Sequence, residues 1–170
     1  MNLLFSTTTK KRQVFNEIRN QLTSQNFSII NDETRPWGGF FVINEQQAQK
    51  FIEQYFPSLK HEEIGTKNKL SPKILIVEAG KRLSWQYHYR RSEIWIVIGG
   101  KVGVIKSDTD QENAINLYET GDIINLKQGE RHRLVGIDSW GIVAEIWQHT
   151  NNDFPSNEED IVRLSDDFGR

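Results

Sequence analysis

The chain has 170 residues, a formal net charge of −2 and no cysteine. This length predicts one ordinary domain rather than two independent cores. The near-neutral charge argues against nucleic acid or an anionic membrane as a partner, and the lack of cysteine excludes disulfides and thiolate metal ligands. The N-terminus is too weakly apolar for a signal peptide, and no later run is long enough to span a bilayer, so we expect a cytoplasmic protein.

Short helices and strands are expected before residue 72. Val14, Ile18 and Leu22 recur every four positions, which is typical of an amphipathic helix. We expect this apolar stripe to pack on the rest of the fold or on a second subunit. The expected elements are a helix at 9–25, a strand at 27–30, a turn at 35–39, a strand at 40–43, a second helix at 45–56 and a loop at 58–71. Residues 1–34 are interpreted as an extension of a domain that covers 35–170.

From residue 73 the pattern changes to short apolar runs that are separated by Gly or polar turns. The expected strands are 73–78, 84–89, 93–98, 101–106, 114–118, 122–126, 132–135 and 142–147. Many short strands at this spacing predict an all-β sandwich or closed barrel. The tail from residue 151 is polar, and we expect its charges to form ion pairs that hold it against the barrel.

Four residues in this second part offer nitrogen and oxygen donors in a pattern typical of a metal site. Gln86 and His88 are two positions apart, so on a strand both point to the same face. A hairpin would return Glu93 to the same point, and His132 follows a second turn that contains Gly. These donors suit a divalent ion with room for substrate oxygens. The alternative is that the histidines are ordinary hydrogen-bonded residues inside a barrel.

The spacing of these donors resembles the two motifs of the cupin family. Gly80, Gln86-Tyr87-His88, Glu93 and Gly99-Gly100 are similar to the first motif, with Gln in place of its first His. Gly121, Lys127-Gln128-Gly129 and His132 are similar to the second motif, with Lys127 where the family usually has Pro.

Further motifs narrow the resemblance. They are Arg35-Pro36-Trp37-Gly38, Leu83-Ser84-Trp85, Arg91-Ser92-Glu93-Ile94-Trp95, Asp160-Ile161-Val162-Arg163 and Asp166-Asp167-Phe168-Gly169-Arg170. Over about 35–44 and 73–170 the chain resembles the isomerase domain of type II mannose-6-phosphate isomerases. The resemblance implies a cupin double-stranded β-helix, or jelly-roll, barrel and a metal-dependent aldose–ketose isomerisation in surface-polysaccharide metabolism. It also implies that Gln86, His88, Glu93 and His132 bind one divalent ion, with zinc as the first choice and manganese, cobalt, nickel or iron as the others. Guanylyltransferase activity, which accompanies this domain in bifunctional relatives, is not expected from the first 34 residues.

The residues around the ligands are assigned to catalysis and to substrate binding. Arg91 matches the family's Arg before the Glu ligand and is expected to act on the substrate, although it could be a solvated hairpin charge. Glu145 is the candidate base, with a structural carboxylate as the alternative. Arg133, Lys127 and Arg90 are candidates for the phosphate of a sugar phosphate, since cations bind that group well. An ion pair is the alternative for Arg133, which on a strand points away from His132.

The sequence departs from the family at several positions near the site. Tyr89-Arg90 and Ile94 replace its usual histidines, and Trp147 replaces its usual Gln. The alternatives are therefore a sugar-phosphate or nucleotide-sugar-binding cupin without activity, or an isomerase or epimerase for another sugar phosphate. A homodimer is expected from the stripe in 9–25 and from the edge strands of a barrel.

Overall fold

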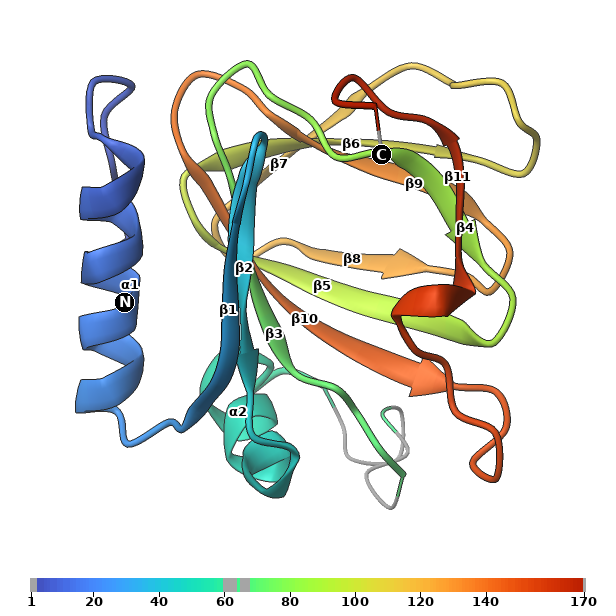
Figure 1. The fold of residues 1–170 in the computed structure, drawn as a ribbon, viewed down its shortest axis with the longest axis horizontal. Helices are drawn as coiled ribbons and strands as arrows, with labels where there is room; N and C mark the ends of the chain where they lie inside the picture. The colour runs from blue at the N-terminus through green and yellow to red at the C-terminus, as the bar shows by residue number, and fades with distance from the viewer. Residues whose placement is uncertain (1–2, 60–63, 65–67, 170) are drawn as a thin grey trace.

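The computed structural model describes residues 3–59, 64 and 68–169, which form two antiparallel sheets with helices on one side (Figure 1). In chain order the elements are α1 (Lys11–Ser24), β1 (Ile29–Arg35), β2 (Gly38–Ile43), η1 (Glu45–Gln47), α2 (Ala48–Tyr55), β3 (Lys73–Val77), β4 (Trp85–His88), β5 (Arg91–Gly99), β6 (Lys101–Ser107), β7 (Asn116–Glu119), β8 (Ile123–Leu126), β9 (Arg131–Gly136), β10 (Gly141–His149), η2 (Glu158–Asp160) and β11 (Ile161–Ser165). The expected all-β barrel with a short helical extension is confirmed. Part of the expected loop at 58–71 lies outside the described residues.

The two sheets face each other across the barrel interior. One sheet has six strands in the order β1-β2-β3-β10-β5-β8, and the other has five in the order β11-β4-β9-β6-β7. Every strand pair is antiparallel. Chain order and sheet order differ, so residues that are far apart in sequence become neighbours at one end of the barrel.

The six-stranded sheet is covered on both faces, and this explains its nearly continuous apolar strands. In β3, Ile74 and Ile76 face the helices, whereas Leu75 and Val77 face the barrel interior. β5 and β10 alternate in the same way, with Ile94, Ile96, Ile142 and Ala144 toward the helices and Trp95, Val97 and Val143 toward the interior. Residues of odd number on β3, β5 and β10 therefore form the inner face of this sheet.

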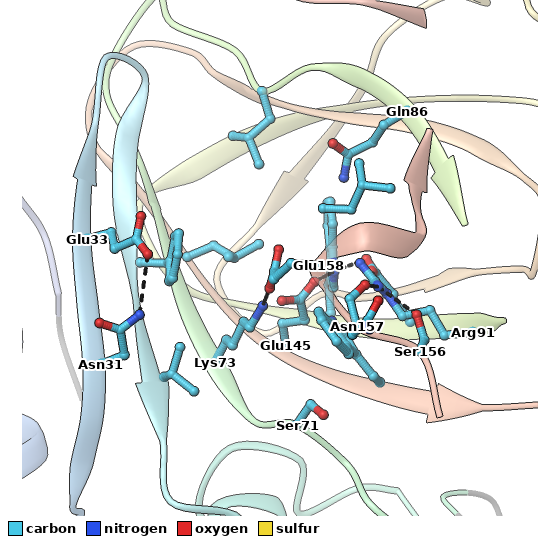
Figure 2. Close-up of a pocket in the computed structure, with 18 of the residues that line it drawn as sticks. Asn31, Glu33, Ser71, Lys73, Gln86, Arg91, Glu145, Ser156, Asn157 and Glu158 are labelled. Atoms are coloured by element: carbon cyan, nitrogen blue, oxygen red, sulfur yellow. Dashed lines mark hydrogen bonds and ion pairs between the residues drawn. The ribbon is translucent and has the colours of Figure 1, made fainter. Parts of the chain in front are cut away.

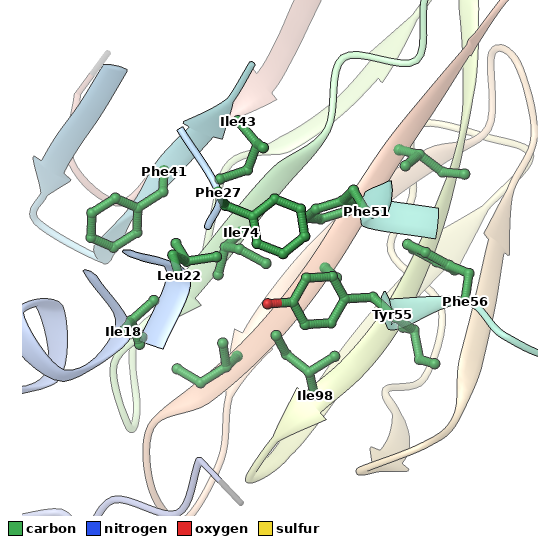
Figure 3. Packing of buried hydrophobic residues seen from close by; sticks show 14 of the residues in the cluster. Ile18, Leu22, Phe27, Phe41, Ile43, Phe51, Tyr55, Phe56, Ile74 and Ile98 are labelled. Atoms are coloured by element: carbon green, nitrogen blue, oxygen red, sulfur yellow. The ribbon is translucent and has the colours of Figure 1, made fainter. Parts of the chain in front are cut away.

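The apolar stripe of α1 is buried within this single chain. Val14, Ile18 and Leu22 are each at most 2% exposed and belong to the same cluster as Ile74. Figure 3 shows Ile18 and Leu22 packed among aromatic rings of this cluster, and Phe15 of α1 lies 5.4 Å from the ring of Phe41. Because the stripe packs on the barrel of its own chain, it gives no support for a dimer interface. The homodimer itself stays a prediction.

Two segments extend the barrel beyond the expected strands. β1 continues to Arg35, through a stretch of polar residues, and pairs with β2. β11 pairs with β4, so the C-terminal tail adds a strand to the five-stranded sheet (Figure 1). The expected tail ion pairs are present in part, since Arg82 donates two hydrogen bonds to Asp167, at 2.7 and 2.9 Å. Arg170 lies outside the described residues.

Among the described residues, neither α1 nor α2 is both long and apolar enough to cross a membrane.

Truncation of the buried stripe of α1 should destabilise the whole domain. Ile18→Ala should lower the free energy of unfolding by about 2–4 kcal/mol, because it removes buried methyl groups and leaves a cavity. Asn20→Ala on the exposed face of the same helix is the matched control and should change it by less than about 0.5 kcal/mol. Urea denaturation measures both. Equal small effects would show that α1 does not belong to the core.

Candidate metal centre and its pocket

Charged and aromatic side chains continue the inner face of the six-stranded sheet toward one end of the barrel. Arg91 and Glu93 precede Trp95 on β5 at inner positions, and Glu145 and Trp147 follow Val143 on β10. The strand register places Trp147 opposite Glu93 and Glu145 opposite Trp95. The alternation that fills the core therefore also brings these polar groups to one place.

His88, Glu93 and His132 form a buried cluster whose potential ligand atoms lie within 4.8 Å of one another. His88 Nε2 is 3.2 Å from Glu93 Oε1, and His132 Nε2 is 3.5 Å from Glu93 Oε2. Each of the three residues is 2% exposed. Glu93 belongs to one sheet and the histidines to the other, so the cluster bridges the barrel interior.

The donor atoms of this cluster fit a divalent metal ion. His132 Nδ1 lies 3.0 Å from the carbonyl oxygen of Glu130, which fixes the proton on Nδ1 and leaves Nε2 as a lone-pair donor. That Nε2 is buried and has no hydrogen-bond partner. Burial lowers the pKa of His132 to about 4, so the ring is neutral at neutral pH. Burial opposes ionisation of Glu93, but His88 and Arg91 outweigh it and hold its pKa well below the usual value. Two imidazole nitrogens and one carboxylate are a common ligand set for zinc and related ions.

Gln86 lies next to the cluster and lines the same pocket. It is in register with His132 across β4 and β9. Its Oε1 accepts a hydrogen bond from Ser84 Oγ at 2.6 Å. A hydroxyl both donates and accepts, so the Gln86 amide could rotate and still bond Ser84, this time through its NH2 group. Ligation by Gln86 stays a prediction.

Arg91 is 2% exposed and contacts two members of the cluster. Its Nε donates to Glu93 Oε1 at 2.7 Å, and its Nη2 lies 3.2 Å from His88 Nε2. The guanidinium packs on Trp147, 3.5 Å from the ring centroid, and also bonds Ser156 Oγ at 2.8 Å. This predicted catalytic residue is therefore a fixed, buried cation beside the cluster, not a solvated hairpin charge.

Glu145 is a buried carboxylate that shares a donor with Glu93. Trp95 Nε1 lies 3.1 Å from an oxygen of each carboxylate. Burial and the negative charge of Glu93 raise the pKa of Glu145 to about 8. A carboxyl group with this pKa exchanges a proton near neutral pH, as a general acid or base must.

Glu93 of the cluster lines a cavity of about 700 Å³, whereas His88 and His132 lie behind it, outside the lining residues. Its walls come from both sheets, from the β1–β2 hairpin and from the C-terminal segment, and include Glu33, Lys73, Arg91, Glu145 and Glu158. Figure 2 shows these side chains converging from different parts of the chain.

Three predicted substrate-binding residues lie outside the lining of this pocket. Arg133 pairs with Glu112 at 2.6 Å and donates to the carbonyl of Leu83, which supports the ion-pair alternative. Lys127 is exposed. Arg90 packs over the ring of Phe154 at 4.1 Å. All three are close in sequence to cluster residues, but their side chains point elsewhere.

The sequence analysis missed several groups that surround the cluster. Ser156 bonds Arg91 and donates to Asp160 Oδ2 at 2.6 Å, and Asp160 also accepts from the backbone N–H groups of Tyr89 and Arg90. Lys73 lines the pocket from β3. The Asp160-Ile161-Val162-Arg163 motif indicated this segment, but no local pattern indicated its contact with Arg91.

Comparison with known proteins identifies the family. The sequence pattern described as "Mannose-6-phosphate isomerase C-terminal" matches residues 43–166, so the chain belongs to this family. The match includes 45–71, which the sequence analysis placed outside the resemblance, and excludes Arg35-Pro36-Trp37-Gly38.

Two similar proteins are much longer than this chain. The chain is 28% identical over 119 residues to "Mannose-1-phosphate guanylyltransferase" of Salmonella montevideo, covering 69% of this chain and 23% of that protein. It is 30% identical over 133 residues to "Alginate biosynthesis protein AlgA" of Pseudomonas syringae pv. tomato, covering 76% of this chain and 26% of that protein. The chain thus spans about a quarter of the length of these relatives.

Solved structures support the fold. The capsular polysaccharide assembling protein CapF from Staphylococcus aureus has a TM-score of 0.54 and 14% identity, covering 79% of this chain and 34% of that one. Oxalate decarboxylase from Bacillus subtilis has a TM-score of 0.55 and 12% identity, covering 79% and 30%. These similarities confirm the expected cupin-type barrel.

Loss of the cluster carboxylate should abolish metal binding. Glu93→Gln keeps the shape of the side chain but removes the only charged ligand, so we expect zinc content to fall from one ion per chain to a small fraction. Glu130→Gln is the matched control, because Glu130 lies in the adjacent turn and its carboxylate bonds only the backbone N–H of Lys127 among described contacts. Elemental analysis after zinc loading and desalting measures both. Equal zinc content in the two variants would contradict the assignment.

Proposed function

We propose that this chain is a metal-dependent aldose–ketose isomerase for a sugar phosphate, with mannose 6-phosphate and fructose 6-phosphate as the first pair to consider. The observation that carries the proposal is the buried His88–Glu93–His132 cluster, whose Glu93 lines the same cavity as Glu145 and Arg91. Family membership supports the substrate class.

The reaction moves a proton between C2 and C1 of the sugar, and negative charge develops on a sugar oxygen. A divalent ion held by His88, Glu93 and His132, with Gln86 as a fourth candidate, would supply electrostatic stabilisation of that charge. The rest of the chemistry falls to side chains of this chain.

Glu145 is the candidate for carrying the proton. Its hydrogen bond from Trp95 holds the carboxyl group in the pocket beside the cluster, where it can take a proton from the sugar and return it. Arg91 fixes Glu93 through the 2.7 Å bond and places a buried cation beside the pocket, which favours negative charge on the substrate. The surrounding barrel excludes bulk water from both groups.

The size of the cavity is compatible with a sugar phosphate. Sites for small molecules usually measure about 300–1,000 Å³. The cavity here, at about 700 Å³, has both charged and aromatic walls. Such walls suit a ligand with polar hydroxyl groups, an apolar ring face and an anionic end.

The alternative is a protein that binds a sugar phosphate without converting it. The position of the Trp147 indole in the pocket favours this alternative. This indole replaces the usual Gln of the family and covers both Arg91 and the pocket wall. The other departures give no such support, since Ile94 packs on the helix side of the sheet and Tyr89 is 60% exposed.

An isomerase assay on metal-loaded protein tests the proposal. Mannose 6-phosphate should be converted to fructose 6-phosphate, and His88→Ala and His132→Ala should each lose metal and at least about 100-fold in activity, because loss of mere supporting partners costs about 10–100-fold. Lys127→Ala should keep full activity, as its side chain lies outside the pocket.

Absence of turnover with zinc, manganese, cobalt, nickel and iron would contradict isomerase activity. Calorimetric binding of mannose 6-phosphate in the same samples would then favour the alternative, and a panel of other sugar phosphates would test the substrate.

A further inference from the structure

Lys73 is a buried cation in the pocket wall for which the isomerase chemistry above has no role. It is 7% exposed and lies at the first inner position of β3, in line with Leu75 and Val77. The register of β3 and β10 places it opposite Glu145. A buried ammonium group is costly unless it is paired, so its partners are informative.

The described polar partner of Lys73 is Glu158, which forms an ion pair and hydrogen bond with the ammonium group. Two aromatic rings also contact the ammonium group, with Trp147 at 4.1 Å and Phe40 at 5.4 Å from Nζ to the ring centroids. The cation is therefore fixed by the barrel, whereas the anion comes from the short turn η2.

The two halves of this pair differ in how easily they can move. The side chain of Lys73 is 9% exposed and that of Glu158 is 62% exposed. Much of the Glu158 side chain already contacts water, so it can turn outward once its contact with Lys73 is replaced, although that contact lowers its pKa and is favourable. Lys73 cannot leave its place without uncovering the rings of Trp147 and Phe40. An anion that bonds the Lys73 ammonium group more strongly can therefore replace Glu158.

Lys73 also lies at a suitable place for the far end of a sugar phosphate. Figure 2 shows Lys73 and Arg91 on either side of Glu145. The strand order β3-β10-β5 separates Lys73 from Glu93 by two strand spacings, or about 10 Å between backbones. A hexose 6-phosphate carries its reacting carbons, C1 and C2, at the end opposite to its phosphate.

Other cations of the pocket are less suited to this task. Arg91 already bonds Glu93, Ser156 and the carbonyl of Asn157. Arg35 pairs with Glu33 on the outer hairpin. Lys69 and Arg163 are exposed and not held in place by burial.

We propose that Lys73 binds the phosphate group of the substrate and that Glu158 occupies the same ammonium group until the phosphate displaces it. This inference rests on the proposed function for its substrate class. It assigns the two residues opposite roles, because Lys73 attracts the phosphate and Glu158 competes with it.

Calorimetry with mannose 6-phosphate tests these opposite roles, and mannose serves as the probe that lacks the phosphate. Lys73→Met keeps an unbranched apolar stem but removes the ammonium group, so mannose 6-phosphate affinity should fall about 10–100-fold, as expected for a lost hydrogen bond to a charged group. Glu158→Gln removes the competing charge, so affinity should rise several-fold. Mannose affinity should stay the same in both variants.

A purely structural ion pair predicts a different result. Both variants would then lose affinity together, for mannose as well as for mannose 6-phosphate, and this would overturn the inference. Unchanged mannose 6-phosphate affinity in Lys73→Met, or no binding by the parent protein, would overturn it as well. If Lys73→Met does not fold, Lys73→Arg keeps the charge and should retain selective binding, while Glu158→Gln still reports the competition. Turnover is measured separately from binding. Phosphate binding that depends on Lys73, without isomerisation, would support this inference and contradict the proposed isomerase activity.

Discussion

The buried ion pair between Arg91 and Glu93 is the interaction on which the rest of the site depends. It places two opposite charges, each 2% exposed, inside a barrel whose neighbouring positions are apolar. Removing one partner of such a pair typically costs about 3–5 kcal/mol, because the other charge stays buried alone. The protein stabilises Arg91 further through Trp147, Ser156 and Asn157. The pair thus joins the six-stranded sheet to the C-terminal segment and holds the Glu93 carboxylate toward the histidines.

The charged site and the apolar core are two ends of the same strand faces. Trp95 and Val97 lie in the core between the sheets, and the same face of β5 continues to Glu93 and Arg91. β3 and β10 follow the same arrangement, with Lys73 and Glu145 beyond their apolar inner residues. Packing at one end of the barrel therefore fixes the geometry at the other, without a flexible loop that carries the central residues.

Local patterns were sufficient for the features that depend on one strand or helix. The four-residue spacing of α1 and the two-residue spacing of Gln86 and His88 indicated faces that the structure contains. β11 is a short strand of five residues, Ile161–Ser165, within a largely polar tail, so its pairing with β4 was not predictable from its own residues.

The wider pocket depends on contacts between distant segments. Glu158 reaches Lys73 across 85 positions of the chain, and Ser156 reaches Arg91 across 65. The phosphate-binding assignments to Arg133, Lys127 and Arg90 relied on closeness in sequence to the cluster. Adjacent residues on a strand point to opposite faces, so closeness in sequence did not bring these three side chains into the pocket lining, and their role in substrate binding stays a prediction.

Anomalous diffraction from a zinc-loaded crystal, measured on both sides of the zinc absorption edge, tests the central claim most directly. The account predicts one strong peak per chain, located between His88 Nε2, Glu93 and His132 Nε2, with Arg91 still bonded to Glu93 or to Ser156. No peak at this cluster, or zinc bound only at surface carboxylates, would contradict it.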